Sequence, residues 1–558
     1  MIDNYAIADN FSLLSKLMDI HNDNSFKAKS YSSAAFTIEK LPMQLSELPI
    51  DKIFTIKGIG ETTGKKIIEQ LQTGQLTILN EYISKTPPGI LEMLTIKGIG
   101  PKKIATIWKE LEIETLGELL YACNENRLTL YKGFGEKTQQ NIKEAIEFYF
   151  STSGIFLYQQ VESYTKSVEE SLSHNFSNYQ FAITGSFKQQ FETIEKLEWI
   201  TTCPLNKLYS FFTENNFTLI NQTENYISLK GKENLLIGFF YTNPANFYWE
   251  LFITSSSEIF LKKWNSIFVS SSKNYTSEED IFSSNHLPFI PSYLRETEII
   301  IDKALQNNLP KIISPNEIKG IIHSHSKWSD GVCSLEEMAK ACLERGLEYL
   351  VISDHSKSAF YANGLNEERI IAQHEEIAGL NKKLNPFKIY KSIESDILND
   401  GSLDYNNTIL NSFDIIIASI HSNLKMSEDK AMMRLLKAIE NPFTSIIGHM
   451  TGRLLLSRKG YPIDHKKIID ACAANDVAIE LNAHPRRLDI DWRWIDYALT
   501  KNVLISINPD AHSIDGFDDC RFGVLVAQKA GLTKEKNLSS FSITDFEKFI
   551  LQQKTKRK

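Results

Sequence analysis

The sequence predicts a multidomain protein with an all-α N-terminal region, an α+β middle region and a C-terminal (β/α)7 barrel. Three observations indicate this order: glycine turns between helical segments, short β-prone runs after Gly154, and apolar strands that alternate with amphipathic helices after Pro315. A chain of 558 residues is long enough for about three to five domains. We place the domains at 1–150, 151–275, 276–316 and 317–558.

The composition excludes several classes of protein. Hydrophobic residues make up 42% of the chain and charged residues 23%, as in ordinary globular proteins. No apolar run reaches the roughly 18 residues of a membrane span and no signal-peptide pattern is visible, so we expect a cytoplasmic protein without membrane contact. The 6 cysteines include no Cys-x-x-Cys pair, which argues against disulfides and a thiolate zinc site. The net charge of -8 means that any contact with DNA must be local.

The N-terminal region contains three turns of similar sequence, at 56–60, 96–100 and 131–135, each between helix-patterned segments. Free N–H groups at the start of the second helix, together with its macrodipole, favour an anion such as DNA phosphate. The candidate phosphate-contacting residues are Lys57, Gly58, Gly60, Lys97, Gly98, Gly100, Lys102, Lys132, Gly133 and Gly135. The turns resemble helix-hairpin-helix motifs, which bind the DNA backbone without reading the base sequence.

Short β-prone runs between helix-patterned segments predict an α+β domain in the middle of the chain. The runs lie at 180–184, 226–229, 235–241 and 250–253. The segment that follows, 270–315, is rich in Ser, Asn and Pro, which is typical of a linker.

In the C-terminal region, nearly every apolar strand stops at a polar residue. The residues at or just after the strand ends are His323, Asp354, His355, Glu394, His421, His449, Asn482, Asp510 and His512. A barrel of seven strands with intervening helices would bring these ends to one face, where such barrels carry their active sites. Ser334 and Glu337 form a capping box that predicts the start of one intervening helix.

The spacing of these polar residues indicates metal binding. His323 and His325, like Asp510 and His512, stand at positions i and i+2 of an extended segment, so both side chains point the same way. Imidazole and carboxylate without thiolate suit Zn, Mn or Fe, and Glu394 could bridge two ions. A cluster of two or three ions lowers the pKa of a bound water and holds both reacting oxygens of a phosphoester. The predicted reaction is therefore hydrolysis at phosphorus.

Basic groups follow the candidate ligands. Arg453 and Arg458 come directly after His449, and Arg487 follows Asn482 at the next strand end. Guanidinium groups form two parallel hydrogen bonds to phosphate oxygens, so Arg453 and Arg458 are candidate catalytic residues. Asn482 and Arg487 are candidate phosphate-binding residues. For each arginine taken singly, a surface salt bridge is the alternative.

The motifs at these strand ends resemble a known family. They read His-Ser-His at 323–325, Trp-Ser-Asp-Gly at 328–331, Ser-Asp-His-Ser at 353–356, Ser-Ile-His-Ser at 419–422 and Asp-Ala-His-Ser at 510–513. Together with Glu394 and Gly448-His449 they are similar to the motifs of a polymerase-and-histidinol-phosphatase (PHP) domain, from about residue 318 to 549. In that family nine ligands bind three divalent ions in a distorted seven-stranded barrel, and every ligand position is filled here.

The resemblance implies a set of ligands for each ion. The first ion would be held by His323, His325, Glu394 and Asp510, the second by Glu394, His421 and His449, and the third by Asp330, His355 and His512. The expected cofactors are three divalent ions, Mn, Zn or Fe, with Mg as an alternative. Glu394, as the residue shared by two ions, is also a candidate catalytic residue.

The order of the regions resembles bacterial family X DNA polymerases (PolX). Segment 26–42 is similar to the first helices of their small N-terminal domain, and 287–296 to the junction between their polymerase and PHP domains. That family carries the motif Gly-Ser-x-Arg-Arg-Gly-x-Glu-Thr-x-Gly-Asp-x-Asp, whose aspartates hold the catalytic Mg ions. The aligned residues here are Gly185 and Ser186 at the start, Lys196 and Glu198 at the two aspartates, and Gly238 at a third aspartate.

Two-metal phosphoryl transfer needs carboxylates at fixed positions, so we expect the polymerase module to be inactive. A different metal arrangement, through Glu195 and Glu198, stays open.

Three hypotheses for function follow. The preferred one is a metal-dependent phosphoesterase of DNA repair that acts on 3′ ends as a 3′-to-5′ exonuclease, with AP endonuclease cleavage or 3′-end cleaning as related activities. Its partner would be gapped, nicked or 3′-end-containing DNA, and we expect a monomer. The alternatives are a small-molecule phosphatase of the histidinol-phosphate type and a DNA-binding scaffold without catalysis.

Overall fold

The computed structural model describes residues 2–41, 43–96, 98–151, 154–231, 234–268 and 274–557. The chain divides into two compact units, the first formed by Met1–Cys123 and Leu128–Glu147, the second by Asn124–Arg127 and Phe148–Lys558. The further boundaries that we placed at residues 275 and 316 fall inside the second unit and stay predictions. No helix among the described residues has both the length and the apolar character to span a membrane.

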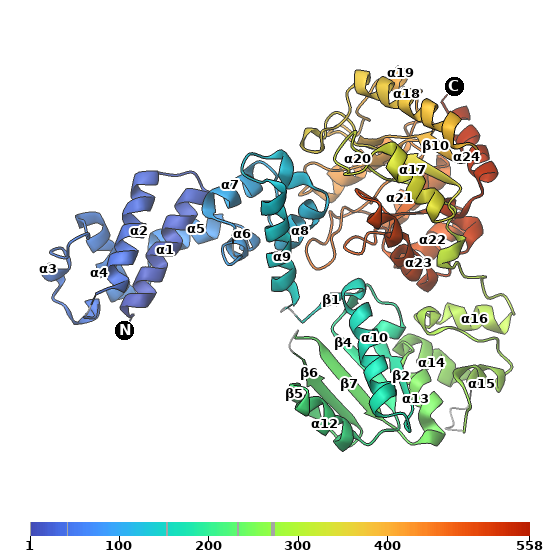
Figure 1. Ribbon diagram of the computed structural model, residues 1–558, viewed down its shortest axis with the longest axis horizontal. Helices are drawn as coiled ribbons and strands as arrows, with labels where there is room; N and C mark the ends of the chain where they lie inside the picture. Colours follow the sequence, from blue (N-terminus) through green and yellow to red (C-terminus); the bar gives the residue numbers. More distant parts are fainter. Residues whose placement is uncertain are drawn as a thin grey trace. The chain divides into compact units, whose positions relative to one another are not determined.

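The N-terminal region is α-helical, as the sequence predicted, and is drawn in blue to cyan in Figure 1. Its helices are α1 (Asn4–Ile20), α2 (Ser25–Glu39), α3 (Ile50–Ile53), α4 (Glu61–Thr73), α5 (Thr77–Lys85), α6 (Pro88–Met93), α7 (Pro101–Lys109), α8 (Leu116–Asn124) and α9 (Glu136–Ser151). Side-chain caps fix where the first two helices begin. The Asp3 side chain accepts a hydrogen bond from the Ala6 amide, and the Asn24 side chain accepts hydrogen bonds from the Phe26 and Lys27 amides.

The middle region is α+β. Its main sheet has the strand order β2-β4-β7-β6-β5, in which only β4 and β7 run parallel. The strands are β1 (Phe156–Leu157), β2 (Phe181–Thr184), β3 (Thr193–Ile194), β4 (Lys196–Thr201), β5 (Thr218–Gln222), β6 (Tyr226–Lys230) and β7 (Leu236–Tyr241). The helices are α10 (Tyr158–Asn175), α11 (Gly185–Lys188), α12 (Leu205–Glu214) and α13 (Phe247–Thr254).

Alternating side chains of β4 divide the core of this region between the two faces of the sheet. Leu197 and Trp199 belong to the same buried cluster as residues of α10 and α12, whereas Ile200 packs with Phe247 and Leu251 of α13. Our prediction of a strand at 250–253 was therefore wrong. Helical spacing lets Phe247 and Leu251, four residues apart, bury one apolar face against the sheet, and this packing overrides the β-propensity of the segment.

The segment predicted as a linker contains two short packed helices, α15 (Glu278–Ser283) and α16 (Ile299–Leu305), and it follows α14 (Glu258–Ile267). Phe260, Trp264, Phe282 and Ile301 form a buried cluster with Phe252 of α13. The interpretation from Ser, Asn and Pro content missed the apolar residues spaced along these helices.

The C-terminal region alternates parallel strands and helices, which confirms its predicted α/β character. Its strands are β8 (Gly320–Ile321), β9 (Tyr349–Ile352), β10 (Lys388–Lys391), β11 (Glu394–Asp396), β12 (Ile417–Ser419), β13 (Ile446–Ile447), β14 (Ala478–Asn482) and β15 (Ile505–Asn508). Its helices are α17 (Leu335–Glu344), α18 (Glu367–Leu384), α19 (Asn407–Leu410), α20 (Glu428–Ile439), α21 (His465–Ala474), α22 (Ile495–Thr500), α23 (Cys520–Lys529) and α24 (Ile543–Thr555). The capping box of Ser334 and Glu337 opens α17 as predicted.

The parallel strands form two sheets, β10-β9-β8 and β11-β12-β13-β14-β15. Isolated parallel bridges join them, Ser324 to Ala511 after β8 and β15, and His355 to Glu394 between β9 and β11. Closure into a seven-stranded barrel stays a prediction. Phe546 and Phe549 of α24 are buried with residues at the beginnings of β9, β12, β13 and β14, so the opposite, carboxyl ends of these strands are left for functional groups.

Candidate functional site

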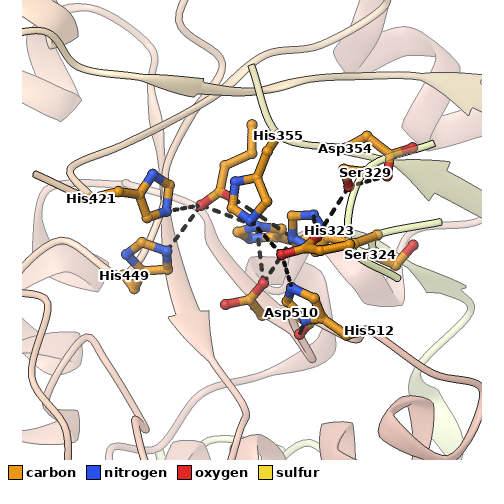
Figure 2. Close-up of polar contacts among 12 residues, drawn as sticks. His323, Ser324, Ser329, Asp354, His355, His421, His449, Asp510 and His512 are labelled. Atoms are coloured by element: carbon orange, nitrogen blue, oxygen red, sulfur yellow. Dashed lines mark hydrogen bonds and ion pairs between the residues drawn. The ribbon is translucent and has the colours of Figure 1, made fainter. Parts of the chain in front are cut away.

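The nine predicted metal ligands converge at the carboxyl ends of the parallel strands. Figure 2 labels His323, His355, His421, His449, Asp510 and His512 among them. They come from the segments after β8, β9, β12, β13 and β15, and from the start of β11. Eight are buried, and the side chain of His421 is 11% exposed. His323 and Asp510 adopt left-handed φ angles of 64° and 53°, which side chains other than glycine rarely take. Such strain persists where the surrounding structure fixes a functional geometry.

Glu394 lies at the middle of the cluster. Its Oε1 is 2.9 Å from His449 Nε2, 3.0 Å from His421 Nε2 and 3.3 Å from His323 Nε2. Its Oε2 is 3.0 Å from His355 Nδ1. One carboxylate therefore faces imidazoles from four different strand ends, which is the placement expected of a bridging ligand.

Two aspartates complete the cluster. Asp510 Oδ1 is 3.0 Å from His325 Nε2 and 3.3 Å from His323 Nε2. Asp330 Oδ2 is 3.5 Å from His512 Nε2 and 3.6 Å from His355 Nε2. The carboxylates and imidazoles thus alternate through the site.

Three sets of these residues have ligand atoms within 4.8 Å of one another, as one ion requires. The sets are His323, His325 and Asp510; His355, Glu394 and His421; and His325, Asp330, His355 and His512. They resemble the three sets that the sequence implied, although His355 stands with Glu394 and His421 where we expected His449. The number and identity of the ions stay predictions.

The donor set fits divalent cations. Several buried atoms that face the cluster lie close to other ligand atoms without forming an aligned hydrogen bond among the described residues, notably His323 Nε2, Asp330 Oδ2, Glu394 Oε2 and His512 Nε2. Buried polar atoms without a partner are rare and call for an explanation, and coordination of an ion provides one. The chemistry agrees, because neutral imidazole and carboxylate are common ligands of Zn, Mn and Fe.

The electrostatics also favour positive charge. Burial lowers the pKa of His421, but the carboxylates of Glu394 and Asp396 outweigh it and raise that pKa to about 10. His512 behaves in the same way beside Asp330, with a pKa of about 10. His325 differs, because burial and the neighbouring imidazoles of His512 and His355 lower its pKa to about 3. The carboxylates therefore create a site where cations are stabilised.

Further carboxylates orient the ligands, and the sequence analysis missed two of them. Glu480 accepts a hydrogen bond at 2.6 Å from His323 Nδ1, which turns Nε2 of that ring toward the cluster. Asp396 bonds His421 Nδ1 in the same manner. The alternation of side chains along a strand could have identified both. Glu480 stands two residues before the candidate Asn482, and Asp396 stands two residues after the candidate Glu394, so each points to the same side of its strand as that candidate.

Asp354 holds the loop that carries the ligand Asp330. Its carboxylate accepts hydrogen bonds from the Ser326 amide and hydroxyl, at 2.8 and 2.7 Å, from the Ser329 hydroxyl and from Gln373 Nε2. These four bonds tie the loop to β9 and α18. The strand-end position of Asp354 is thus explained by a supporting role.

Asn482 serves the cluster from within the fold. Its Nδ2 donates to Asp510 Oδ2 at 3.0 Å and to Glu480 Oε1 at 3.1 Å, and the side chain is fully buried. We predicted that Asn482 binds phosphate, but these bonds use its amide group to position Asp510. Arg487 lies near the ligands, with Nε 3.8 Å from Asp510 Oδ2.

Arg453 points toward a neighbouring loop, where its guanidinium is fully engaged. Nε donates to the Arg487 carbonyl at 2.9 Å, Nη1 pairs with Asp491 at 2.7 Å, and Nη2 donates to the Leu488 carbonyl. Nη2 also lies 3.6 Å from Glu192. The predicted catalytic role of Arg453 therefore has no geometric support, because its hydrogen-bond donors fix the loop that carries Arg487. Arg458 donates from Nε to the Gly452 carbonyl at 2.9 Å, and its catalytic role stays a prediction.

The residues of the degenerate polymerase motif lie together in the middle region. Glu198 of β4 pairs in register with Gly238 of β7. Lys196 Nζ is 2.6 Å from Glu198 Oε1, and the Tyr226 hydroxyl donates to the same oxygen at 3.3 Å. A Cβ atom on Gly238 would lie 2.5 Å from that hydroxyl. A lysine ammonium and a tyrosine thus occupy the place where the motif would have further carboxylates.

The three glycine turns have one common geometry. Gly58, Gly98 and Gly133 have φ angles of 94°, 93° and 95°, which glycine adopts without steric cost. Gly60 and Gly100 are the N-caps of α4 and α7 and make no side-chain capping bond, and Gly135 directly precedes α9. Lys57, Lys102 and Lys132 are exposed beside the turns. Lys97 lies outside the described residues.

Sequence comparison finds known domains at both ends of the chain. A model described as "Helix-hairpin-helix domain" matches residues 2–76, and one described as "SAM-like Helix-hairpin-helix tandem" matches residues 90–147. A model described as "PHP domain" matches residues 322–484. This last match contains seven of the nine candidate ligands, and the fold brings Asp510 and His512 to them from outside it.

Several curated proteins are similar to this chain. The DNA polymerase/3′-5′ exonuclease PolX of Bacillus subtilis (strain 168) is 33% identical over 560 residues, which cover 96% of each chain. A probable phosphatase of Caldanaerobacter subterraneus subsp. tengcongensis is 28% identical over 252 residues, or 42% of this chain and 91% of the phosphatase. A probable phosphatase of Vibrio parahaemolyticus is 26% identical over 243 residues, or 41% of this chain and 92% of its own.

Proposed function

Because this chain belongs to the bacterial PolX family of proteins with helix-hairpin-helix and PHP domains, we propose that it is a metal-dependent phosphoesterase of DNA 3′ ends. The proposed reaction is 3′-to-5′ exonuclease hydrolysis, in a chain whose polymerase module is inactive. AP endonuclease cleavage and 3′-end cleaning would use the same centre. The convergence of nine imidazole and carboxylate side chains at one face is the observation that carries the proposal.

The metal centre would perform the chemistry. When bound, the divalent ions would lower the pKa of a bound water and stabilise the charge that develops on the phosphoester. Glu394 would keep the ions close together, and Glu480 and Asp396 would hold His323 and His421 in the correct tautomers. Arg487 is the basic side chain that we assign to the phosphate, supported by its short distance to Asp510.

The inactive polymerase module is the second part of the proposal, for a domain that we infer to be nucleotidyltransferase-like. Divalent ions at that site would need several carboxylates, but Glu198 is already paired with Lys196 and Tyr226. The metal clusters found among the described residues all lie in the C-terminal region. The alternative through Glu195 has no support, because that residue takes no part in these clusters.

The helical hairpins would hold the DNA backbone. If Lys102 and Lys132 contact phosphates, replacing both with alanine weakens DNA binding and lowers the slope of log affinity against log salt by about 2. Fluorescence anisotropy across a salt titration measures this slope. Lys16→Ala, which removes an exposed lysine of α1 outside the three turn sequences, is the control for loss of a surface charge. A slope in the double variant equal to that of the control would contradict the assignment.

The similarity to probable phosphatases favours one alternative, hydrolysis of a small phosphomonoester by the same centre. The hairpins argue against it, because a small substrate has no need of a DNA-binding unit. Comparison of turnover on an oligonucleotide and on histidinol phosphate separates the two.

One assay tests the proposed function directly. A 5′-labelled primer-template is incubated with Mn, with and without dNTPs, using the wild-type protein and a His323→Ala/His325→Ala variant. We expect shortening from the 3′ end by the wild type, none by the variant, and no extension in any lane. Extension of the primer would contradict the proposal that the polymerase module is inactive. An unchanged primer in every lane would contradict the proposed nuclease activity.

A further inference from the structure

A compact loop beside the metal centre carries the most exposed large hydrophobic side chain among the described residues. This aromatic loop, residues 356–365, follows the ligand His355 and contains Phe360, which is 84% exposed. The next residue, Tyr361, is half-buried, and its ring centroid is 6.2 Å from that of His355. Single exposed apolar residues are common. What sets Phe360 apart is its position one residue from a side chain that lines the metal centre.

The aromatic loop is closed at its base. The Leu365 amide donates to the His355 carbonyl at 2.9 Å, and Ser356 forms a β-bridge with Leu365. A Cβ atom on Gly364 would lie 1.9 Å from the Ser356 carbonyl oxygen, so the two arms approach as closely as only glycine permits. The two ends of the loop are therefore held together by its own backbone.

Side chains also fix the loop to the metal centre. The Ser358 hydroxyl donates at 2.7 Å to Asp396, which itself orients the ligand His421. Arg369 donates at 2.7 Å to the Asn363 carbonyl and also to the Trp328 carbonyl, two residues before the ligand Asp330. A rigid attachment matters because a preformed binding surface loses little entropy when a ligand binds.

The two rings have different surroundings. The Arg127 guanidinium, which belongs to the same unit, lies 4.3 Å from the Tyr361 ring centroid. The other side of the Tyr361 ring environment is the metal centre, since its centroid lies 6.2 Å from that of the ligand His355. Phe360 is the ring left open to solvent. The loop thus presents one ring near the metal centre and Arg127, and a second ring, adjacent in sequence, that is free to contact a base.

We propose that Phe360, held by the aromatic loop, is a stacking subsite for the nucleobase of the 3′-terminal nucleotide. The inference rests on the proposed function, because it assumes that the metal centre receives a DNA 3′ end. Stacking on an aromatic ring accepts every base, since each has a π-face, and requires that the base be unpaired. The subsite would give the centre a preference for nucleotides over other phosphoesters.

The test compares two oligonucleotide 3′ ends, a normal nucleoside and an abasic tetrahydrofuran residue, each joined by a phosphorothioate linkage that resists cleavage. Affinities are measured by fluorescence anisotropy with Mn. We expect the wild type to bind the nucleoside end about 10-fold more tightly. Phe360→Ala should bind both ends equally, and Phe360→Tyr should keep the preference. Leu551→Ala, which removes another exposed apolar side chain, should keep it as well.

The outcomes separate the subsite from the proposed function. Equal binding of both ends by the wild type, or a preference that persists in Phe360→Ala, would refute the subsite even if the protein degrades DNA. Preferential binding that depends on Phe360, in a protein that leaves ordinary linkages intact, would support the subsite and refute the exonuclease.

Discussion

Replacing Glu394 with glutamine is expected to lower the rate of phosphoester hydrolysis by at least about 1,000-fold. Metal ions supply several kcal/mol of transition-state stabilisation, and each 1.36 kcal/mol corresponds to a factor of about ten in rate. Glu394 faces His323, His355, His421 and His449. A neutral amide there would remove the bridging charge and would bring an NH₂ group against metal ions.

The measurements are kcat on a labelled primer and metal content by mass spectrometry. Glu375→Gln is the matched control. It makes the same chemical change at an exposed residue of α18 that is not one of the predicted ligands. We expect Glu394→Gln to contain fewer ions per chain than the control. Full activity in Glu394→Gln would exclude the cluster as the catalytic centre.

Glu480→Gln is expected to weaken metal binding or activity by about 10- to 100-fold, although Glu480 is not a predicted ligand. Its two oxygens accept four hydrogen bonds: from His323 Nδ1 at 2.6 Å and Asn508 Nδ2 at 2.8 Å on one oxygen, and from the His449 amide and Asn482 Nδ2 at 3.1 Å on the other. In glutamine one of these oxygens becomes an NH₂ group that faces donors. The buried network is then left partly unsatisfied.

Titration of the metal-free variant with Mn, followed by activity at saturating Mn, distinguishes positioning from folding. Recovery of much of the activity at high Mn, with an unchanged melting temperature, is the expected result. If Glu480→Gln binds Mn with wild-type affinity, the hydrogen bond from His323 to Glu480 does not contribute to metal binding.

The metal centre could be predicted from the sequence because its signals are local. A parallel strand buried on both faces reads as an apolar run, so the polar residue at its end is conspicuous, as with His323, His421 and His449. The fold then places the strand ends at one face, which makes His323 and Asp510, 187 positions apart in the chain, neighbours at 3.3 Å. Short local patterns also predicted the three glycine turns and the cap of α17.

What the sequence could not show depends on contacts between distant segments. Arg453 follows a metal ligand in the chain, but Asp491 and two loop carbonyls draw its guanidinium away. The side-chain amide of Asn482 is a group that can bind phosphate, and in the fold it donates a hydrogen bond to Asp510. The run at 250–253 has β-propensity and becomes helical because packing on the sheet decides its conformation.

The contact between Gly238 and Tyr226 has a consequence for how such a chain can evolve. A carboxylate restored at Gly238 alone would collide with the Tyr226 hydroxyl, 2.5 Å from a Cβ at that position. One restored at Lys196 alone would leave Glu198 facing a second negative charge where it now has a counter-ion 2.6 Å away. Either single change would therefore meet an unfavourable contact before an ion could bind. In the inactive polymerase module that we propose, a metal-binding triad would require changes at Lys196 and Tyr226 besides Gly238.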